Sequence, residues 1–378
     1  MQKDMLVAKK PATFKGSPKT AIGKALSKTA PFKASQMPAL NFSHLQSLTD
    51  NTGIIQHALF SIPNRKEGYC IDDNARALLL TVWAGKNDKS RVAQTLLPIY
   101  LSYIHYMQTD DGYFGNFLSY AKTSTEERGS EDSYGRTMMA LGFLVNEGPT
   151  HLLVRTGLGI FVKAYEHVGR LVSLRGIANA MIGICQVIKY NYPDDLKEHM
   201  ISQLSDKLIA GYKDNQRDDW HWFEPILTYD NAILPLALLN AYEITQNEEY
   251  LRVALESMRF LESKVFFDGV LRPVGNQGWC KPGGDPAQFD QQGIDVMAMI
   301  LYYQQAFRVT REQQYLDRMY QSYRWFLGVN DLGMALYDPS TGGCADGLHS
   351  EGINFNEGAE STLAYWISHV TVASALAE

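Results

Sequence analysis

Two kinds of helix alternate along most of the chain, and this alternation restricts the fold more than any other sequence feature. Some segments carry a one-sided apolar stripe, which is typical of a helix with one buried face. They are residues 196–209, 248–264 and 312–327. Others are apolar on nearly every side, which predicts burial on several sides. They are residues 177–190, 231–244 and 294–307. The alternation indicates an outer ring of helices around an inner ring.

The expected inner helices recur at a fairly regular spacing. Their starts lie near Asp72, Glu131, Ser173, Tyr229, Asp290 and Glu357, at intervals of 59, 42, 56, 61 and 67 residues. Each interval has room for two helices and two loops, and repeats of this length form solenoids or closed toroids. We therefore expect an all-α (α/α)6 toroid over residues 41–378, one domain with a single large core. Residues 111–117 and 268–275 are expected to form short hairpins after outer helices.

The first 40 residues differ from the rest in charge. They contain eight lysines and one aspartate, a net charge of +7, whereas the whole chain carries −6 and the remainder therefore −13. Because residues 1–40 contain few large apolar side chains, we expect a flexible arm that does not fold alone. The alternative is an arm that packs on the acidic body of its own or a neighbouring molecule.

Composition and missing motifs exclude several classes of function. No apolar run is long enough for a membrane helix, and the N-terminus lacks the apolar core of a signal peptide. The four cysteines are widely spaced and form no CxxC pair, which fits free thiols in the cytoplasm. Neither a phosphate-binding glycine loop nor a histidine metal motif is present. We expect a cytoplasmic protein that uses no metal or cofactor and, given its negative charge, does not bind nucleic acid.

Carboxylates stand at the start of five of the six expected inner helices. One acid in such a place is commonly a helix cap or half of an intrahelical ion pair. In a toroid, however, the N-termini of all inner helices point to the same end, so these acids would converge on one funnel. Residues 72–76 (DDNAR) and 131–136 (EDSYGR) repeat the same order of two acids followed by an arginine. Residues 220–232 (WHWFEPILTYDNA) are the densest cluster of aromatic and polar groups.

A funnel lined by carboxylates and aromatic rings suits a carbohydrate, because rings stack on sugar faces and carboxylates accept hydrogen bonds from hydroxyls. Two carboxyl groups flanking a glycosidic bond can also hydrolyse it. Glu224 is the expected acid, since its aromatic neighbours would raise its pKa by desolvation, and Asp73 or Asp132 is the expected base. The candidate catalytic residues are Asp73, Asp132, Glu224, Asp230 and Asp290. The candidate substrate-binding residues are Asp72, Arg76, Glu131, Arg136, His221, Trp222, Tyr229, Trp279, Gln291, His349, Glu357 and Glu360.

Six motifs taken together resemble a bacterial all-α family related to the six-hairpin glycosidase superfamily. They are GYCIDDNARAL, GSEDSYGR, WFEPILTYDNAILPLALL, FDQQ, TGGCADGL and NEGAESTLAYW, within residues 42–376. Members of that family occur as C-terminal domains of group 1 glycosyltransferases or as separate proteins near them. The resemblance implies an (α/α)6 toroid and a role with an oligosaccharide or glycoconjugate. This chain lacks a transferase domain, so any sugar-nucleotide chemistry would come from a separate glycosyltransferase partner.

Two functions besides hydrolysis remain open. Epimerases of the N-acetylglucosamine 2-epimerase type share the toroid and typically use a pair of histidines in the funnel. Here His221 and His349 are the loop histidines placed for that role. The third possibility is a glycan-binding partner of a glycosyltransferase that performs no catalysis, since a binding funnel would use the same residues.

Overall fold

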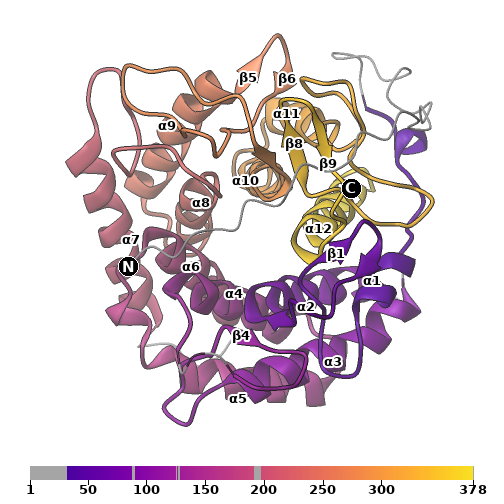
Figure 1. The fold of residues 1–378 in the computed structure, drawn as a ribbon. Coiled ribbons are helices and arrows are strands. Elements are labelled where there is room, and N and C mark those ends of the chain that lie inside the picture. Colours follow the sequence, from indigo (N-terminus) through magenta and orange to yellow (C-terminus); the bar gives the residue numbers. More distant parts are fainter. Residues whose placement is uncertain (1–31, 87–89, 125, 127, 191–196, 378) are drawn as a thin grey trace.

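The computed structural model describes residues 32–86, 90–124, 126, 128–190 and 197–377. Within them, six long helices form a ring (Figure 1). They are α2 (Ile71–Gly85), α4 (Glu131–Glu147), α6 (Leu174–Lys189), α8 (Ile233–Thr245), α10 (Gly293–Thr310) and α12 (Ala359–Ala375). Each packs on the next in this order, and α12 packs on α2, which closes the ring. Every one begins within four residues of the position expected from the sequence.

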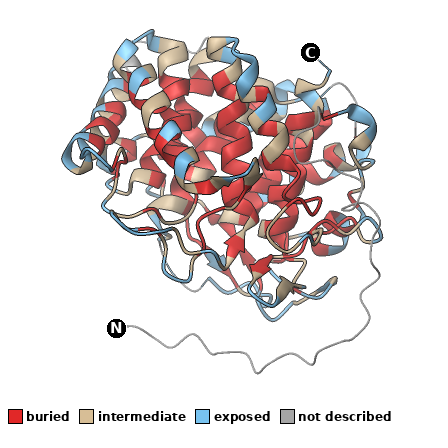
Figure 2. Cartoon of the chain, turned by 90° about the horizontal axis from the view of Figure 1, so that it is seen from above, coloured by how far each residue is buried: buried red, intermediate tan, exposed pale blue. Residues whose placement is uncertain are grey.

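An outer layer of helices surrounds this ring. It consists of α3 (Arg91–Met107), α5 (His151–Tyr165), α7 (Lys197–Asn215), α9 (Glu248–Val265) and α11 (Gln313–Tyr323), with the short α1 (Ser43–Leu48) beside α12. Each of the five longer helices packs against the inner helix that precedes it in the chain. The described helices thus confirm the all-α (α/α)6 toroid. Burial follows the two layers, because the inner helices are buried over most of their surface and the outer ones on one face (Figure 2).

Glycines line the contact between α4 and α6, the two inner helices whose expected starts are also the closest in the chain, 42 residues apart. A Cβ atom on Gly135 or Gly142 of α4 would collide with the backbone carbonyl of Gly176 or Gly183 of α6. The absence of side chains at these four positions lets the two helices lie unusually close together. Serine hydroxyls cap both helices at their N-termini, which satisfies exposed backbone N–H groups there.

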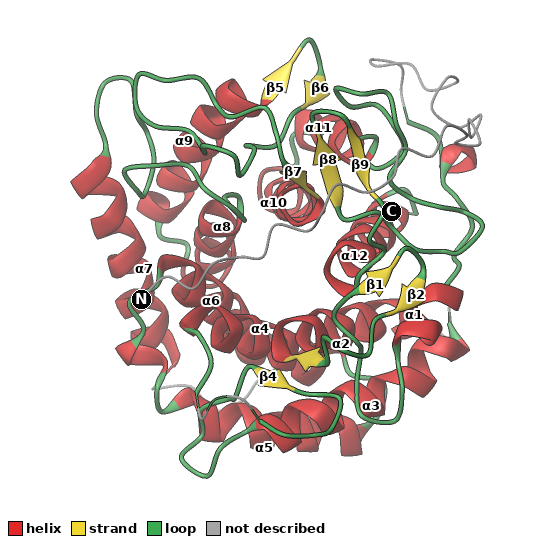
Figure 3. Ribbon diagram, in the orientation of Figure 1, coloured by secondary structure: helices red, strands yellow, loops and turns green. Residues whose placement is uncertain are grey.

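Short strands occupy the end of the barrel at which the inner helices begin (Figure 3). They are β1 (Ala58–Leu59), β2 (Ile62–Pro63), β3 (Tyr69–Cys70), β4 (Phe117–Leu118), β5 (Phe266–Phe267), β6 (Val270–Leu271), β7 (Gln291–Gln292), β8 (Gly347–His349) and β9 (Gly352–Asn354). β5 and β6 form the hairpin expected near residues 268–275. The segment 111–117 also folds back after an outer helix, through an antiparallel bridge between Gln108 and Phe114. It then leads into β4, which pairs with β3 and so ties two loops together.

The described part of the expected N-terminal arm contacts the toroid. Phe32 is buried and its ring stacks on Tyr320, with centroids 5.6 Å apart, and meets Tyr323 edge-on. Residues 1–31 lie outside the described residues, so the flexible arm stays a prediction. The four cysteines are buried and unpaired by disulfides. Among the described helices, none combines the length and the hydropathy that crossing a bilayer requires.

Candidate functional site

A ring of charged side chains lies where the inner helices begin. Its acids are Asp72, Asp73, Asp132, Glu224, Asp230, Asp295 and Glu360, and its cations are Arg76, Arg136 and Arg175. Nearer the middle of the barrel, apolar residues of the same helices line the lumen. The charged residues precede them by one or two helical turns, so helical periodicity places both on the lumen-facing side of each helix. The convergence of these groups at one end is the arrangement that the motif positions predict.

Arg136 joins three elements of the ring. Its Nη1 donates to Asp72 at 2.7 Å, and its Nη2 lies 3.4 Å from Asp230. Asp230 is almost fully buried in the turn before α8, and its Oδ1 has no partner among the described residues. Burial raises the pKa of Asp230, and the guanidinium of Arg136 opposes that rise. One guanidinium therefore holds two carboxylates of unequal exposure close together.

Arg76 makes the corresponding junction between α2 and α12. It donates to Asp73 at 3.1 Å and pairs with Glu360 at 3.0 Å. Asp73 is 4% exposed, and the thiol of Cys70 donates to it at 3.0 Å. Burial raises the pKa of Asp73 to about 6, against the opposing effect of Arg76. Asp73 is therefore a carboxyl group that takes up a proton near neutral pH.

Arg175 occupies the place where the sequence suggests an apolar surrounding for Glu224. It donates to Glu224 at 2.9 Å and to the carbonyl oxygen of Tyr229 at 2.7 Å, and its guanidinium lies 4.5 Å above the Tyr229 ring. The hydroxyls of Tyr229 and Ser173 both donate to Asp132. The neighbour of Glu224 is thus a cation rather than the aromatic enclosure that the sequence suggests. A single arginine at the start of an otherwise apolar helix was the sequence signal for Arg175.

Asp295 is a second group that the sequence reasoning missed. It lies buried in the first turn of α10, close to the backbone of Asp230 and Asn231. Burial and the nearby Asp230 carboxylate raise the pKa of Asp295 to about 8. Its signal in the sequence was one acid within a helix expected to be apolar on every side.

A histidine and two acids form a neighbouring cluster on the loops before α10 and α12. The Nδ1 atom of His349, on β8, lies 2.7 Å from Asp290, and Gln277 donates to the same carboxylate at 3.0 Å. Burial and Glu360 raise the pKa of Asp346 to about 6, while His57 and His349 oppose the rise. The electrostatic effect of Glu360 on Asp346 places this cluster beside the charged ring.

The structure places two expected binding residues away from the ring. Trp222 is 0% exposed and packs against Phe223 and Phe260, so it belongs to the core and cannot contact a sugar in this conformation. The Nδ1 atom of His221 lies 3.1 Å from Glu256, on the outer helix α9. The density of aromatic residues in 220–232 thus reflects packing between layers as well as the site.

Two further candidates hold the backbone or the core together. Glu131 accepts hydrogen bonds from the backbone N–H groups of residues 172–173, at 2.8 and 2.5 Å. Gln291 is fully buried, donates to Asp331 at 2.7 Å and accepts from Trp325 at 2.9 Å. The observed hydrogen bonds of both residues therefore stabilise the fold.

The last two candidates differ from each other. Glu357, which precedes α12 in the chain, accepts a hydrogen bond from Thr341 at 2.8 Å and lies beside His44. Trp279 is partly exposed, and its ring centroid is 6.4 Å from that of Tyr229, so it borders the charged ring. Trp279 is therefore an aromatic residue of the expected set that is available to stack on a sugar.

The chemistry available at this end is proton transfer and hydrogen bonding. Within the described ranges, no three His, Cys, Asp or Glu side chains are grouped so that they could hold a metal ion. The ring instead combines carboxylates held by arginines with carboxyl groups whose pKa values burial raises toward neutrality. Such a combination places proton donors and acceptors side by side.

Comparison with known proteins finds similarity at the level of structure. No family model and no curated protein matches the sequence. A D-mannose isomerase superimposes with a TM-score of 0.64 and 11% identity over 88% of this chain and 94% of that one. A sugar epimerase from a ruminal bacterium superimposes with a TM-score of 0.66 and 10% identity, over 88% of this chain and 95% of that one. A GH76 α-mannanase of Bacteroides thetaiotaomicron has a TM-score of 0.57 and 13% identity, over 81% of this chain and 86% of that one. At such low identity these likenesses establish the (α/α)6 toroid fold and leave the reaction to be argued from the site.

Proposed function

We propose that the charged ring is the active site of a carbohydrate-processing enzyme and that the reaction is hydrolysis of a glycosidic bond by carboxyl groups. The solved structures that share the fold are named as sugar isomerases, sugar epimerases and mannanases. The ring itself offers what hydrolysis needs, which is one carboxyl group that donates a proton and one that acts as base or nucleophile.

Asp72 and Asp73 carry the assignment. They are consecutive residues at the start of α2 in unlike surroundings. Asp73 is buried and its pKa is raised to about 6, so it can act as the proton donor. Asp72 is more exposed and is held by Arg136 at 2.7 Å, so it serves as base or nucleophile. Asp132 is turned toward Tyr229 and α6, which suits it to positioning sugar hydroxyls.

The test is turnover of a panel of oligosaccharides, with new reducing ends detected by NMR. Asp72→Asn and Asp73→Asn should each lower kcat/KM by about 100-fold or more. Asp206→Asn, which removes an exposed acid on α7, is the matched control and should leave turnover unchanged. Because the proton donor is lost on ionisation, kcat/KM should fall as the pH rises through about 6. Near-normal turnover in both active-site variants would sink the assignment.

One observation favours a second candidate, a sugar epimerase. His349 and Asp290 form a pair 2.7 Å apart, in which the carboxylate can orient the imidazole as a base. An epimerase releases no new reducing end, and it should lose activity on His349→Gln while keeping it on Asp73→Asn. Binding of glycans without turnover, together with co-purification of a glycosyltransferase, would favour the non-catalytic partner instead.

A further inference from the structure

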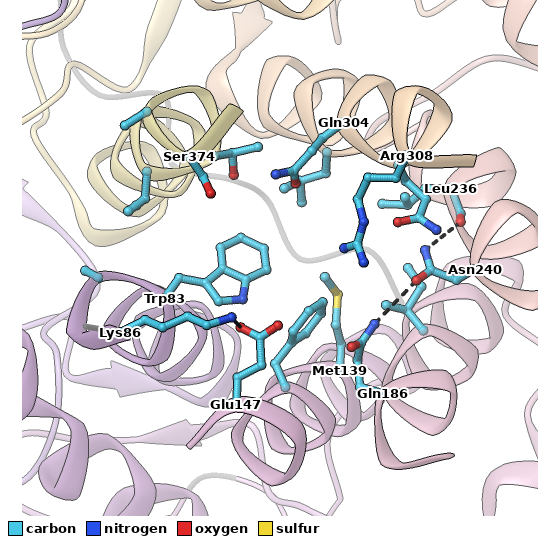
Figure 4. A pocket seen from close by; sticks show the side chains of 18 of the residues that line it. Trp83, Lys86, Met139, Glu147, Gln186, Leu236, Asn240, Gln304, Arg308 and Ser374 are labelled. Carbon is cyan, nitrogen blue, oxygen red and sulfur yellow. Dashed lines mark hydrogen bonds and ion pairs between the residues drawn. The ribbon is translucent and has the colours of Figure 1, made fainter. Parts of the chain in front are cut away.

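The inner ring encloses a cavity of about 720 Å³ at the end opposite the charged ring (Figure 4). Most of its lining residues belong to the C-terminal halves of the inner helices. This volume falls within the roughly 300–1,000 Å³ of small-molecule sites. Buried side chains such as Met139 and Leu301 line its inner end, whereas Lys86, Arg311 and Ser374 are exposed at its mouth.

An apolar layer separates this cavity from the charged ring. Met139 and Leu301 also line a second cavity of about 30 Å³, room for about one water molecule, on whose far side lie Arg136 and Asp230. Leu79 and Ile367 belong to the same layer. The 720 Å³ cavity shares no residue with the proposed catalytic pair, so an occupant of it would be distinct from the substrate.

Positive charge is in excess at the mouth of the cavity. Arg308 reaches into it from α10, and its ion pair with Glu243 is long, at 3.6 Å. Glu243 already has a closer partner in Lys189, at 2.7 Å. Arg311 makes no ion pair with any described residue. An arginine with only a long ion pair and a second with none among the described residues are suited to bind a phosphate or carboxylate group.

The walls offer groups that fit a sugar ring. The Trp83 indole borders the cavity, packed edge-on against Phe143 with centroids 5.0 Å apart. Across the cavity Gln304 has no hydrogen-bond partner among the residues that the structure describes. Gln186 donates to Asn240 at 3.4 Å, which fixes two more amides in the wall. An aromatic face with several amides can accommodate both the apolar face and the hydroxyls of a sugar.

We propose that this cavity is a second binding site, for an anionic sugar whose phosphate or carboxylate is held by Arg308 and Arg311. The sugar ring lies against Trp83, and Gln304 bonds to its hydroxyls. The site is independent of the reaction at the other end of the barrel.

Isothermal titration calorimetry of the purified protein at low salt tests the proposal, with a hexose 6-phosphate, a hexuronate and a neutral hexose as probes. At least one anionic sugar should bind saturably, and the neutral hexose at least about tenfold more weakly. Arg308→Gln should weaken the anionic sugar by about tenfold or more. Gln304→Trp, which fills the cavity from a partly exposed position, should abolish binding. Comparison of the two anions identifies the preferred group.

The matched control is Arg252→Gln, which removes an exposed arginine of α9 that pairs with Glu256. Affinity should be unchanged in this variant and in Asp73→Asn, which separates the cavity from the proposed catalytic site. The proposal is overturned if no probe binds with a Kd below about 10 mM, or if the neutral hexose binds as well as the anions. It is also overturned if Arg308→Gln has no more effect than Arg252→Gln.

Discussion

Replacing Asp73 by asparagine should stabilise the protein at neutral pH while removing its proposed catalytic acid. The asparagine keeps the size of the side chain but cannot ionise. In the native protein, burial raises the pKa of Asp73 from 3.8 to about 6. Ionisation of this group therefore costs about 3 kcal/mol of folding free energy, because each pKa unit corresponds to about 1.4 kcal/mol.

The sign follows from which state binds the proton more tightly. The folded-state pKa lies above the unfolded value, so the native protein holds the proton more strongly than the unfolded chain does. The cost is absent below about pH 4, grows between pH 4 and 6, and is complete above about pH 6. The stability of Asp73→Asn relative to the wild type should therefore rise by about 3 kcal/mol from about pH 4 to about pH 7.

Urea-induced unfolding at several pH values in this range measures the difference directly. Asp206→Asn, on the exposed face of α7, reports the general effect of removing one negative charge. A relative stability of Asp73→Asn that stays constant with pH, or that falls as the pH rises, would refute the reasoning. Either result would mean that the guanidinium of Arg76, 3.1 Å away, balances or outweighs the effect of burial on this carboxyl group.

Three other substitutions test the placement of groups around the ring. Arg136→Met should destabilise the fold by about 3–5 kcal/mol in urea unfolding at neutral pH, because Asp72 and Asp230 lose the cation that they share; a loss below about 1 kcal/mol would contradict this. Trp222→Phe should cost about 1–3 kcal/mol of stability without changing KM, because the indole is fully buried. Trp279→Ala should instead raise KM by about fivefold or more in steady-state kinetics. Similar KM effects for the two tryptophans would argue against the ring as the sugar site.

The positions of the helices could be predicted because their signals are local. Whether a helix is buried on one side or on all sides is written in the spacing of its own apolar residues, as in 248–264 and 294–307. The same holds for Asp73 and Arg76, which lie one helical turn apart and do form an ion pair at 3.1 Å. The number and order of these helices are consistent with a closed ring, and the packing of α12 on α2 closes it.

The contacts across the ring could not be predicted in this way. Arg136 pairs with Asp72 and Asp230, which are 64 and 94 residues away in the chain. The sequence offers every arginine and acid of the ring but does not say which guanidinium meets which carboxylate. Arg175 changed the interpretation of Glu224 for this reason, because it approaches from α6, 49 residues away.

The sequence by itself determined the toroid, the end of the barrel at which the acids gather, and the residue types found there. Only the tertiary structure decided that Asp73 is a buried acid with a raised pKa, that Glu224 meets Arg175, and that Trp222 belongs to the core. It alone revealed the cavity beside Trp83 and Arg308 at the opposite end. The physical reason is that helix formation depends on neighbours three or four residues apart. Protonation, exposure and cavity shape depend instead on groups that meet only when the ring closes.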